Sequence, residues 1–151
     1  MPHVLLATDA DHLAEDIFAA LVDDETTVSR VRKGTEVRPA VAALEPDLVI
    51  LDLQIGNMGG VAASIDLRHE SDSGRLPRVR ILMLLDRDAD RWIAKEARAD
   101  AELLKPVTSF GLRRAVAAVL ADEPPAGAAV DTEDGTATEA DTEAEDTVAA
   151  G

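Results

Sequence analysis

The sequence predicts an α/β domain over residues 1–121, with a parallel sheet covered by helices on both faces. Five apolar runs of strand length alternate in this region with five segments whose apolar residues recur at helical spacing. Such alternation is typical of parallel strands joined by crossover helices. Residues 122–151 hold ten acids, no Lys or Arg and few large apolar residues, so we expect an acidic disordered tail there.

The composition of the 151-residue chain excludes several classes of protein. It has no cysteine, which excludes disulfide scaffolds, thiolate metal sites and cysteine nucleophiles. The net charge is −15, and residues 1–121 carry 20 acids against 15 bases, which argues against direct DNA binding. No apolar run approaches the ~20 residues of a membrane span, and the N-terminus lacks the basic segment of a signal peptide. We therefore expect a cytoplasmic protein without a membrane segment.

The first three elements are predicted from short apolar patterns. Val4–Ala7 is strand-like, and Thr26–Arg32 is a more polar strand that suits the edge of a sheet. Between them lies a predicted helix, for which Asp11 is available as a cap. Its apolar positions are Leu13, Ile17, Phe18 and Leu21.

The middle of the chain predicts a short helix, a buried strand and a longer helix. The short helix has Val37, Val41 and Leu44 at helical spacing, with Pro39 in its first turn, where a missing N–H is tolerated. Leu48–Leu51 is the third strand, closed by Asp52. The longer helix carries Val61, Ile65 and Arg68 and ends at the polar segment 71–74.

The last four elements follow the same alternation. Val79–Leu85 is the fourth strand, and Ala101–Leu104 is a short fifth strand. The helix between them is predicted over Ala89–Arg98, with an inner face of Trp92, Ile93 and Ala97. The final helix is marked by Leu112, Val116, Val119 and Leu120.

The longest apolar runs are the first, third and fourth strands, which we expect at the centre of the sheet. A flavodoxin-like, doubly wound (βα)5 sheet with strand order 2-1-3-4-5 satisfies this condition. In that order strands one and three lie side by side, at the point where such folds bind ligands.

Polar and charged residues that could bind a ligand stand at the ends of three strands, at the same edge of the predicted sheet. They are Thr8-Asp9 after the first strand, Asp52 at the end of the third and Lys105-Pro106 after the fifth. Two neighbouring carboxylates repel unless a cation joins them, and an all-oxygen ligand set suits Mg²⁺. A lysine ammonium opposite them can neutralise phosphoryl oxygens. The combination predicts a phosphoryl-transfer site.

At these motifs the sequence resembles the receiver domain of two-component response regulators, over nearly all of residues 3–121. Residues 52–60, DLQIGNMGG, are similar to the D-x-x-M-P-x-M-x-G pattern of that family. Lys105-Pro106 matches the family's Lys-Pro pair, whose peptide bond is often cis.

The resemblance implies a function and a set of site residues. Asp52 would accept a phosphoryl group from a histidine kinase or phosphotransfer protein, and Lys105 would contact the phosphoryl oxygens. Asp9, Asp52 and the backbone carbonyl of Gln54 would hold Mg²⁺. Because no effector region follows residue 121, we expect a single-domain protein whose output is contact with a downstream protein. The face that family members commonly use is formed by the fourth helix, fifth strand and fifth helix.

Four departures from the family pattern affect the acidic site and the residues that respond to phosphorylation. Thr8 falls on the first of the paired acids and Asp9 on the second; the other register, with Asp9 first and Ala10 second, does not restore the pair either. Leu85 falls on the family's Thr/Ser, and Asp86 follows where a small residue is usual. Glu102 falls on the switch aromatic.

These departures leave two further hypotheses open. The first is a pseudo-receiver that binds partners without being phosphorylated. Leu85 and Glu102 lack the groups that normally respond to the phosphate, and Asp86 adds like charge near it. The second is a phosphatase or phosphotransferase with Asp52 as nucleophile. Haloacid-dehalogenase-type enzymes, which use such a nucleophile, have a second Asp two residues later, where this chain has Gln54.

Overall fold

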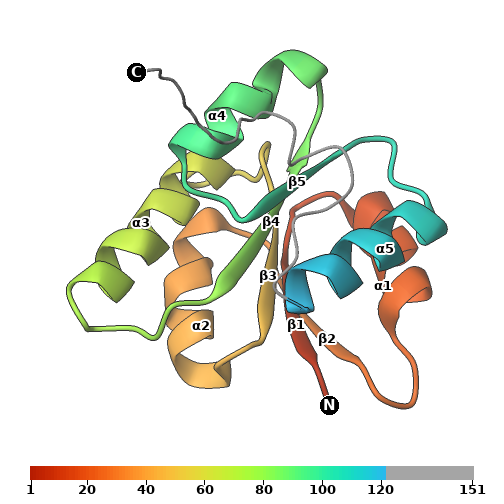
Figure 1. Ribbon diagram of the computed structural model, residues 1–151, viewed down its shortest axis with the longest axis horizontal. Coiled ribbons are helices and arrows are strands. Elements are labelled where there is room, and N and C mark those ends of the chain that lie inside the picture. Colours follow the sequence, from red (N-terminus) through yellow and green to blue (C-terminus); the bar gives the residue numbers. More distant parts are fainter. Residues whose placement is uncertain (122–151) are drawn as a thin grey trace, which may run out of the picture.

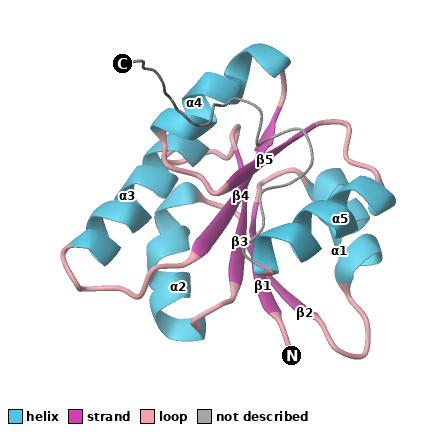
Figure 2. Cartoon of the chain, viewed as in Figure 1, coloured by secondary structure: helices cyan, strands magenta, loops and turns pink. Residues whose placement is uncertain are grey.

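A computed structural model describes residues 1–121; the predicted acidic tail, residues 122–151, lies outside the described residues. Strands and helices alternate along the described part (Figures 1 and 2). The strands are β1 (His3–Ala7), β2 (Thr27–Val31), β3 (Leu48–Asp52), β4 (Arg80–Leu85) and β5 (Ala101–Leu104). The α-helices are α1 (Asp11–Leu21), α2 (Val37–Leu44), α3 (Gly60–Asp72), α4 (Arg91–Glu96) and α5 (Ser109–Leu120), and short 3₁₀ helices span Gly34–Glu36 and Asp88–Asp90. No helix of residues 1–121 has the length and apolar character needed to span a membrane.

The five strands form one parallel sheet in the order β2-β1-β3-β4-β5, which confirms the predicted flavodoxin-like topology. All five residues of β3 are buried, as expected for the central strand, whereas β2 lies at an edge and is partly exposed. Ala7 of β1 pairs with Leu51 of β3, and Asp52 pairs with Leu84 of β4. The carboxyl ends of β1 and β3 therefore lie side by side.

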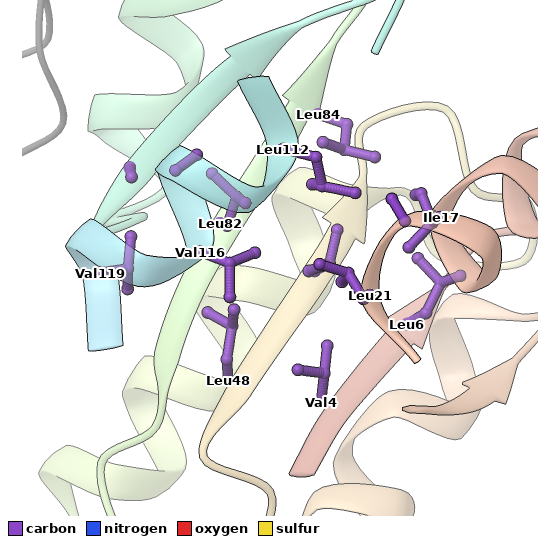
Figure 3. Close-up of a cluster of buried hydrophobic side chains, with 14 of the residues drawn as sticks. Val4, Leu6, Ile17, Leu21, Leu48, Leu82, Leu84, Leu112, Val116 and Val119 are labelled. Carbon is purple, nitrogen blue, oxygen red and sulfur yellow. The ribbon is translucent and has the colours of Figure 1, made fainter. Parts of the chain in front are cut away.

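Helices cover both faces of the sheet (Figure 1). Successive strand residues point to opposite faces, so each strand contributes to two cores. Leu6, Ile50 and Leu84 pack in the core under α1 and α5, which Figure 3 shows in close-up. Leu5, Leu51 and Leu85 pack in the second core, with apolar residues of α2, α3 and α4. The fully apolar runs seen in the sequence are explained by burial on both sides.

Two glycines fix the loop that follows Asp52. Gly60 begins α3, and a Cβ atom there would lie 2.6 Å from the backbone oxygen of Asp52. Gly34 donates its N–H to the carbonyl of Gly56 at 2.9 Å, and a Cβ at Gly34 would collide with the carbonyl of Met58. Larger residues at either position would push the loop away from Asp52, so these glycines help to set the position of the site.

Two predictions about the helices are wrong. Asp11 does not cap α1; Ala10 occupies the cap position, and the Asp11 carboxylate instead pairs with Arg30 and Arg32 of the edge region, which are distant in sequence. Trp92 does not face the core, because its side chain is 65% exposed. Ala97 is buried as predicted, and Ala94, which was not predicted to face inward, is buried beside it.

Arg68 ties α3 to the opposite edge of the sheet from the predicted site. Only 1% of its surface is exposed, and its guanidinium donates to the backbone carbonyls of Val79 and Arg98 and to the carboxylate of Asp100. The same carboxylate accepts the N–H of Ile81 at the start of β4. This buried arginine is satisfied by the fold itself, which indicates a structural role.

Candidate functional site

The structure brings three predicted site residues to the carboxyl edge of the sheet. Asp9 follows β1, Asp52 is the last residue of β3, and Lys105 directly follows β5. The Lys105–Pro106 peptide bond is cis. Parallel strands place all their carboxyl ends at one edge, so residues far apart in sequence converge there.

Lys105 holds the carboxylate of Asp52. Its ammonium lies 2.7 Å from Asp52 Oδ1, and Asp52 is 2% exposed, so this contact compensates a buried charge. Lys105 also pairs with Asp86 Oδ1 at 3.2 Å. Burial alone would lower the pKa of Lys105, but the hydrogen bonds and charges of Asp52 and Asp86 outweigh it and raise the pKa. The lysine is therefore fixed as a cation at neutral pH.

Thr8 is a second partner of Asp52, although the sequence alone indicates only a missing acid at position 8. The Thr8 side chain is fully buried, and its hydroxyl donates to Asp52 Oδ2 at 2.7 Å. The same hydroxyl oxygen accepts the N–H of Ala10 at 3.1 Å. Thr8 thus orients the carboxylate without adding a negative charge.

The loop after Asp52 connects the two carboxylates of the site. The N–H of Gln54 donates to Asp52 Oδ1 at 3.0 Å, and the N–H of Gly56 donates to Asp9 Oδ2 at 3.0 Å. Within residues 1–121 the carbonyl of Gln54 accepts no hydrogen bond. Two carboxylates and a free carbonyl beside one loop are a hard oxygen donor set of the kind that Mg²⁺ accepts together with water. Side chains alone are too few, because no group of three or more His, Cys, Asp or Glu side chains in the described part could hold a metal.

Arg30 is a residue of the site that the sequence analysis missed. Its Nε and Nη2 donate to the backbone carbonyl of Thr8 at 3.1 and 3.0 Å, and its Nη1 pairs with Asp11 at 3.0 Å. The guanidinium therefore fixes the backbone between Thr8 and α1. The only sequence signal was a pair of arginines at alternate positions, Arg30 and Arg32, in a strand predicted to lie at an edge.

The departures from the family pattern have clear positions in the structure. Leu85 is fully buried in the core beside α2, α3 and α4, and offers no donor to the site. Asp86 reaches Lys105, as described above. The Glu102 side chain is 8% exposed and lies 3.9 Å from Arg91 of α4. Acidic side chains therefore occupy two positions where the family has a small residue and an aromatic one: Asp86 beside Lys105, and Glu102 near the start of α4.

Comparison with known protein families agrees with this geometry. The profile of the response regulator receiver domain matches residues 4–117. The response regulator protein PmrA of Pseudomonas aeruginosa is 34% identical over 103 residues, which cover 68% of this chain and 45% of that protein. The DNA-binding response regulator MtrA of Mycobacterium leprae is 33% identical over 103 residues, covering 68% of this chain and 44% of that protein. The chain thus spans less than half the length of these curated relatives.

Solved structures show the same fold. A putative response regulator from Chloroflexus aurantiacus superimposes with a TM-score of 0.71 at 25% identity, covering 80% of this chain and 98% of the other. The chemotaxis response regulator CheY4 of Vibrio cholerae gives a TM-score of 0.71 at 22% identity, covering 79% and 98% of the two chains. The BeF3-activated N-terminal receiver domain of Klebsiella pneumoniae RstA gives 0.69 at 23% identity, covering 78% and 97%.

The contact between Lys105 and Asp52 predicts a measurable coupling in stability. We expect Lys105→Met to lower the free energy of unfolding by about 2 kcal/mol, less than for a fully buried pair because the lysine is partly exposed. Asp52→Asn in the Lys105→Met background should recover most of this loss, because it removes the unpaired buried charge. Urea unfolding of the wild type, both single variants and the double variant measures the coupling. Additive effects would contradict this account of the pair.

The pH dependence of the stability difference between wild type and Lys105→Met follows from the raised pKa of Lys105. A group whose pKa is higher in the folded state adds stability that is complete below its ordinary pKa and is lost as the pH rises through the folded value. The stability gap between wild type and Lys105→Met should therefore be constant near neutral pH and shrink in strongly alkaline solution.

Proposed function

The chain belongs to the response regulator receiver domain family, and we propose that it accepts a phosphoryl group on Asp52 and signals through contacts with other proteins. The observation that carries this proposal is the Asp52 carboxylate, buried at the end of β3 and held by Lys105 at 2.7 Å. A structural aspartate at a strand end would not need both a lysine and the convergence of Asp9 on the same loop.

The proposed reaction is a direct phosphoryl transfer. An oxygen of Asp52 attacks the phosphorus of a phosphohistidine, a P–O bond forms, and the P–N bond breaks with its electrons returning to the imidazole. The product is an acyl phosphate on Asp52. The ammonium of Lys105 is placed to neutralise the phosphoryl oxygens, and the Thr8 hydroxyl keeps the carboxylate in one orientation.

We place a Mg²⁺ site at Asp9, Asp52 and the backbone carbonyl of Gln54. Bound there, the ion would supply positive charge that offsets the charges of the carboxylates and of the phosphoryl oxygens. The residues fit this ion in chemistry, but the hydroxyl of Thr8 replaces one carboxylate and lowers the negative charge of the site. We therefore propose weak binding of Mg²⁺ by the free protein.

The proposed partners are a histidine kinase or phosphotransfer protein as donor and a downstream protein as receiver of the signal. The acidic balance of the chain supports protein contacts rather than DNA as the output, although the relative MtrA is a DNA-binding regulator. A cytoplasmic location and single-domain action stay predictions of the sequence.

A phosphorylation-independent role is the second candidate, and a specific observation favours it. Leu85 is fully buried and has no hydroxyl to bond a phosphoryl oxygen. A catalytic role for Asp52 in hydrolysis is less well supported, because Gln54 contributes a backbone N–H to Asp52 and no acid.

Incubation with acetyl phosphate and Mg²⁺ separates the two candidates. We expect intact-mass measurement to show one added phosphoryl group in the wild type and none in Asp52→Asn, because the attacking oxygen is lost. Asp24→Asn, an exposed aspartate away from the site, is the matched control and should retain the adduct. An unmodified wild type with every donor would leave only the phosphorylation-independent role.

Restoring the missing acid should strengthen the metal site. We expect Thr8→Asp to tighten Mg²⁺ binding by roughly tenfold, since the charge of the ligand set tunes the affinity of such sites. Thr8→Asn introduces a side chain of nearly the same size as Asp but without its charge, and it should not tighten Mg²⁺ binding. Calorimetric titration with Mg²⁺ measures both. Equal affinities of the two variants would show that position 8 lies outside the metal site.

A further inference from the structure

Lys105 has two carboxylate partners, and phosphorylation at Asp52 would change how strongly it pairs with each of them. In the structure it lies 2.7 Å from Asp52 and 3.2 Å from Asp86. Phosphorylation replaces the single negative charge of the Asp52 carboxylate by roughly two negative charges on the phosphoryl oxygens, which lie beyond the carboxyl group. Lys105 would then pair with the phosphoryl oxygens, and Asp86 would face a like charge without its cation. Asp86 is therefore the residue placed to respond to phosphorylation first.

The segment after Asp86 transmits any displacement through a run of ion pairs. Arg87 bonds Asp90 at 2.9 Å, and Asp90 is nearly buried directly before α4. Asp88 pairs with Arg91, the first residue of α4, at 2.7 Å. A shift of Asp86 thus moves a short segment whose charges are already attached to the start of α4.

Arg91 stands between two acids at unequal distances. Its Nε lies 2.7 Å from Asp88, and its Nη1 lies 3.9 Å from Glu102 of β5. Asp88 is exposed, whereas the Glu102 side chain is 8% exposed. A nearly buried carboxylate with one distant cation gains from a closer contact. If Asp88 moves away with its segment, Arg91 has a second partner ready.

We propose that Asp86, Arg91 and Glu102 form an ion-pair relay that reports phosphorylation in this chain, in place of the missing hydroxyl and aromatic residue. The proposal rests on the proposed function, because its input is the phosphoryl group on Asp52. On phosphorylation Asp86 leaves Lys105, the 86–90 segment shifts, and Arg91 exchanges Asp88 for Glu102. The altered start of α4 is the output. The simpler alternative is that these are surface ion pairs without consequence.

A tryptophan at the start of α4 allows this change in ion pairing to be followed by fluorescence. Trp92 is the single tryptophan of the chain, directly follows Arg91 and is 65% exposed, so its emission responds to the surroundings of the start of α4. Acetyl phosphate and Mg²⁺ are added to the full-length chain, and Trp92 emission and intact mass are recorded on the same samples. We expect the emission to shift as the phosphoryl adduct forms.

Two variants with opposite expected effects test the relay. Glu102→Gln should form the adduct as the wild type does but lose the emission change, because Arg91 has no acid to move to. Asp88→Asn should shift the emission of the unphosphorylated chain towards that of the phosphorylated wild type, because Arg91 is released beforehand. Lys95→Gln is the matched control: it removes an exposed cation of the same helix, three residues after Trp92, and should leave the response intact.

The outcomes separate the relay from the proposed function. An adduct without any change in Trp92 emission, or with the same change in Glu102→Gln, overturns the relay and leaves phosphorylation standing. A chain that forms no adduct overturns both, because the relay then has no input. An emission change that is lost in Glu102→Gln, imitated by Asp88→Asn and kept in Lys95→Gln supports it.

Discussion

Asp52 carries a nearly buried carboxylate at the end of a strand whose other residues are apolar and fully buried. Removing such a charge from water costs several kcal/mol unless partners compensate it. Lys105 and Thr8 provide that compensation from the ends of β5 and β1, at 2.7 Å each. The strand order that places these two ends on either side of β3 is therefore what allows the carboxylate to be buried. The two glycines at the loop after Asp52 help to bury the carboxylate, because they let the loop pack closely against neighbouring backbone.

The charges around Asp52 are redistributed relative to the family pattern. One acid is absent at Thr8, on the side where Asp9 lies, and one is present at Asp86, beside Lys105. The first change weakens attraction for a divalent cation, and the second gives Lys105 an additional partner. Three carboxylates and one ammonium still leave the site negative. This charge distribution supports the proposed binding of a cation and a phosphoryl group, and the additional acid, Asp86, directly follows β4.

The sequence was sufficient for features that depend on local pattern. The apolar runs of β1, β3 and β4 predicted the central strands and their order, and the strand ends predicted the convergence of Asp9, Asp52 and Lys105. Features that depend on distant partners were not predictable. Asp11 is a residue type that commonly caps helices, but its carboxylate pairs with Arg30 of β2 and with Arg32, which directly follows that strand. The pairing of Asp86 with Lys105 joins residues 19 positions apart, and helical spacing alone did not show that Trp92 lies on the exposed side of α4.

The central claim is that Asp52 receives the phosphoryl group and that Lys105 then pairs with the phosphoryl oxygens. A crystal structure of the protein with beryllofluoride and Mg²⁺, a stable mimic of the acyl phosphate, tests this most directly. The account predicts beryllium bound to a carboxylate oxygen of Asp52, the Lys105 ammonium turned to a fluoride, and Asp86 released from Lys105. Beryllofluoride absent from Asp52 at saturating concentration, or bound there with Lys105 still paired to Asp86, would contradict the account.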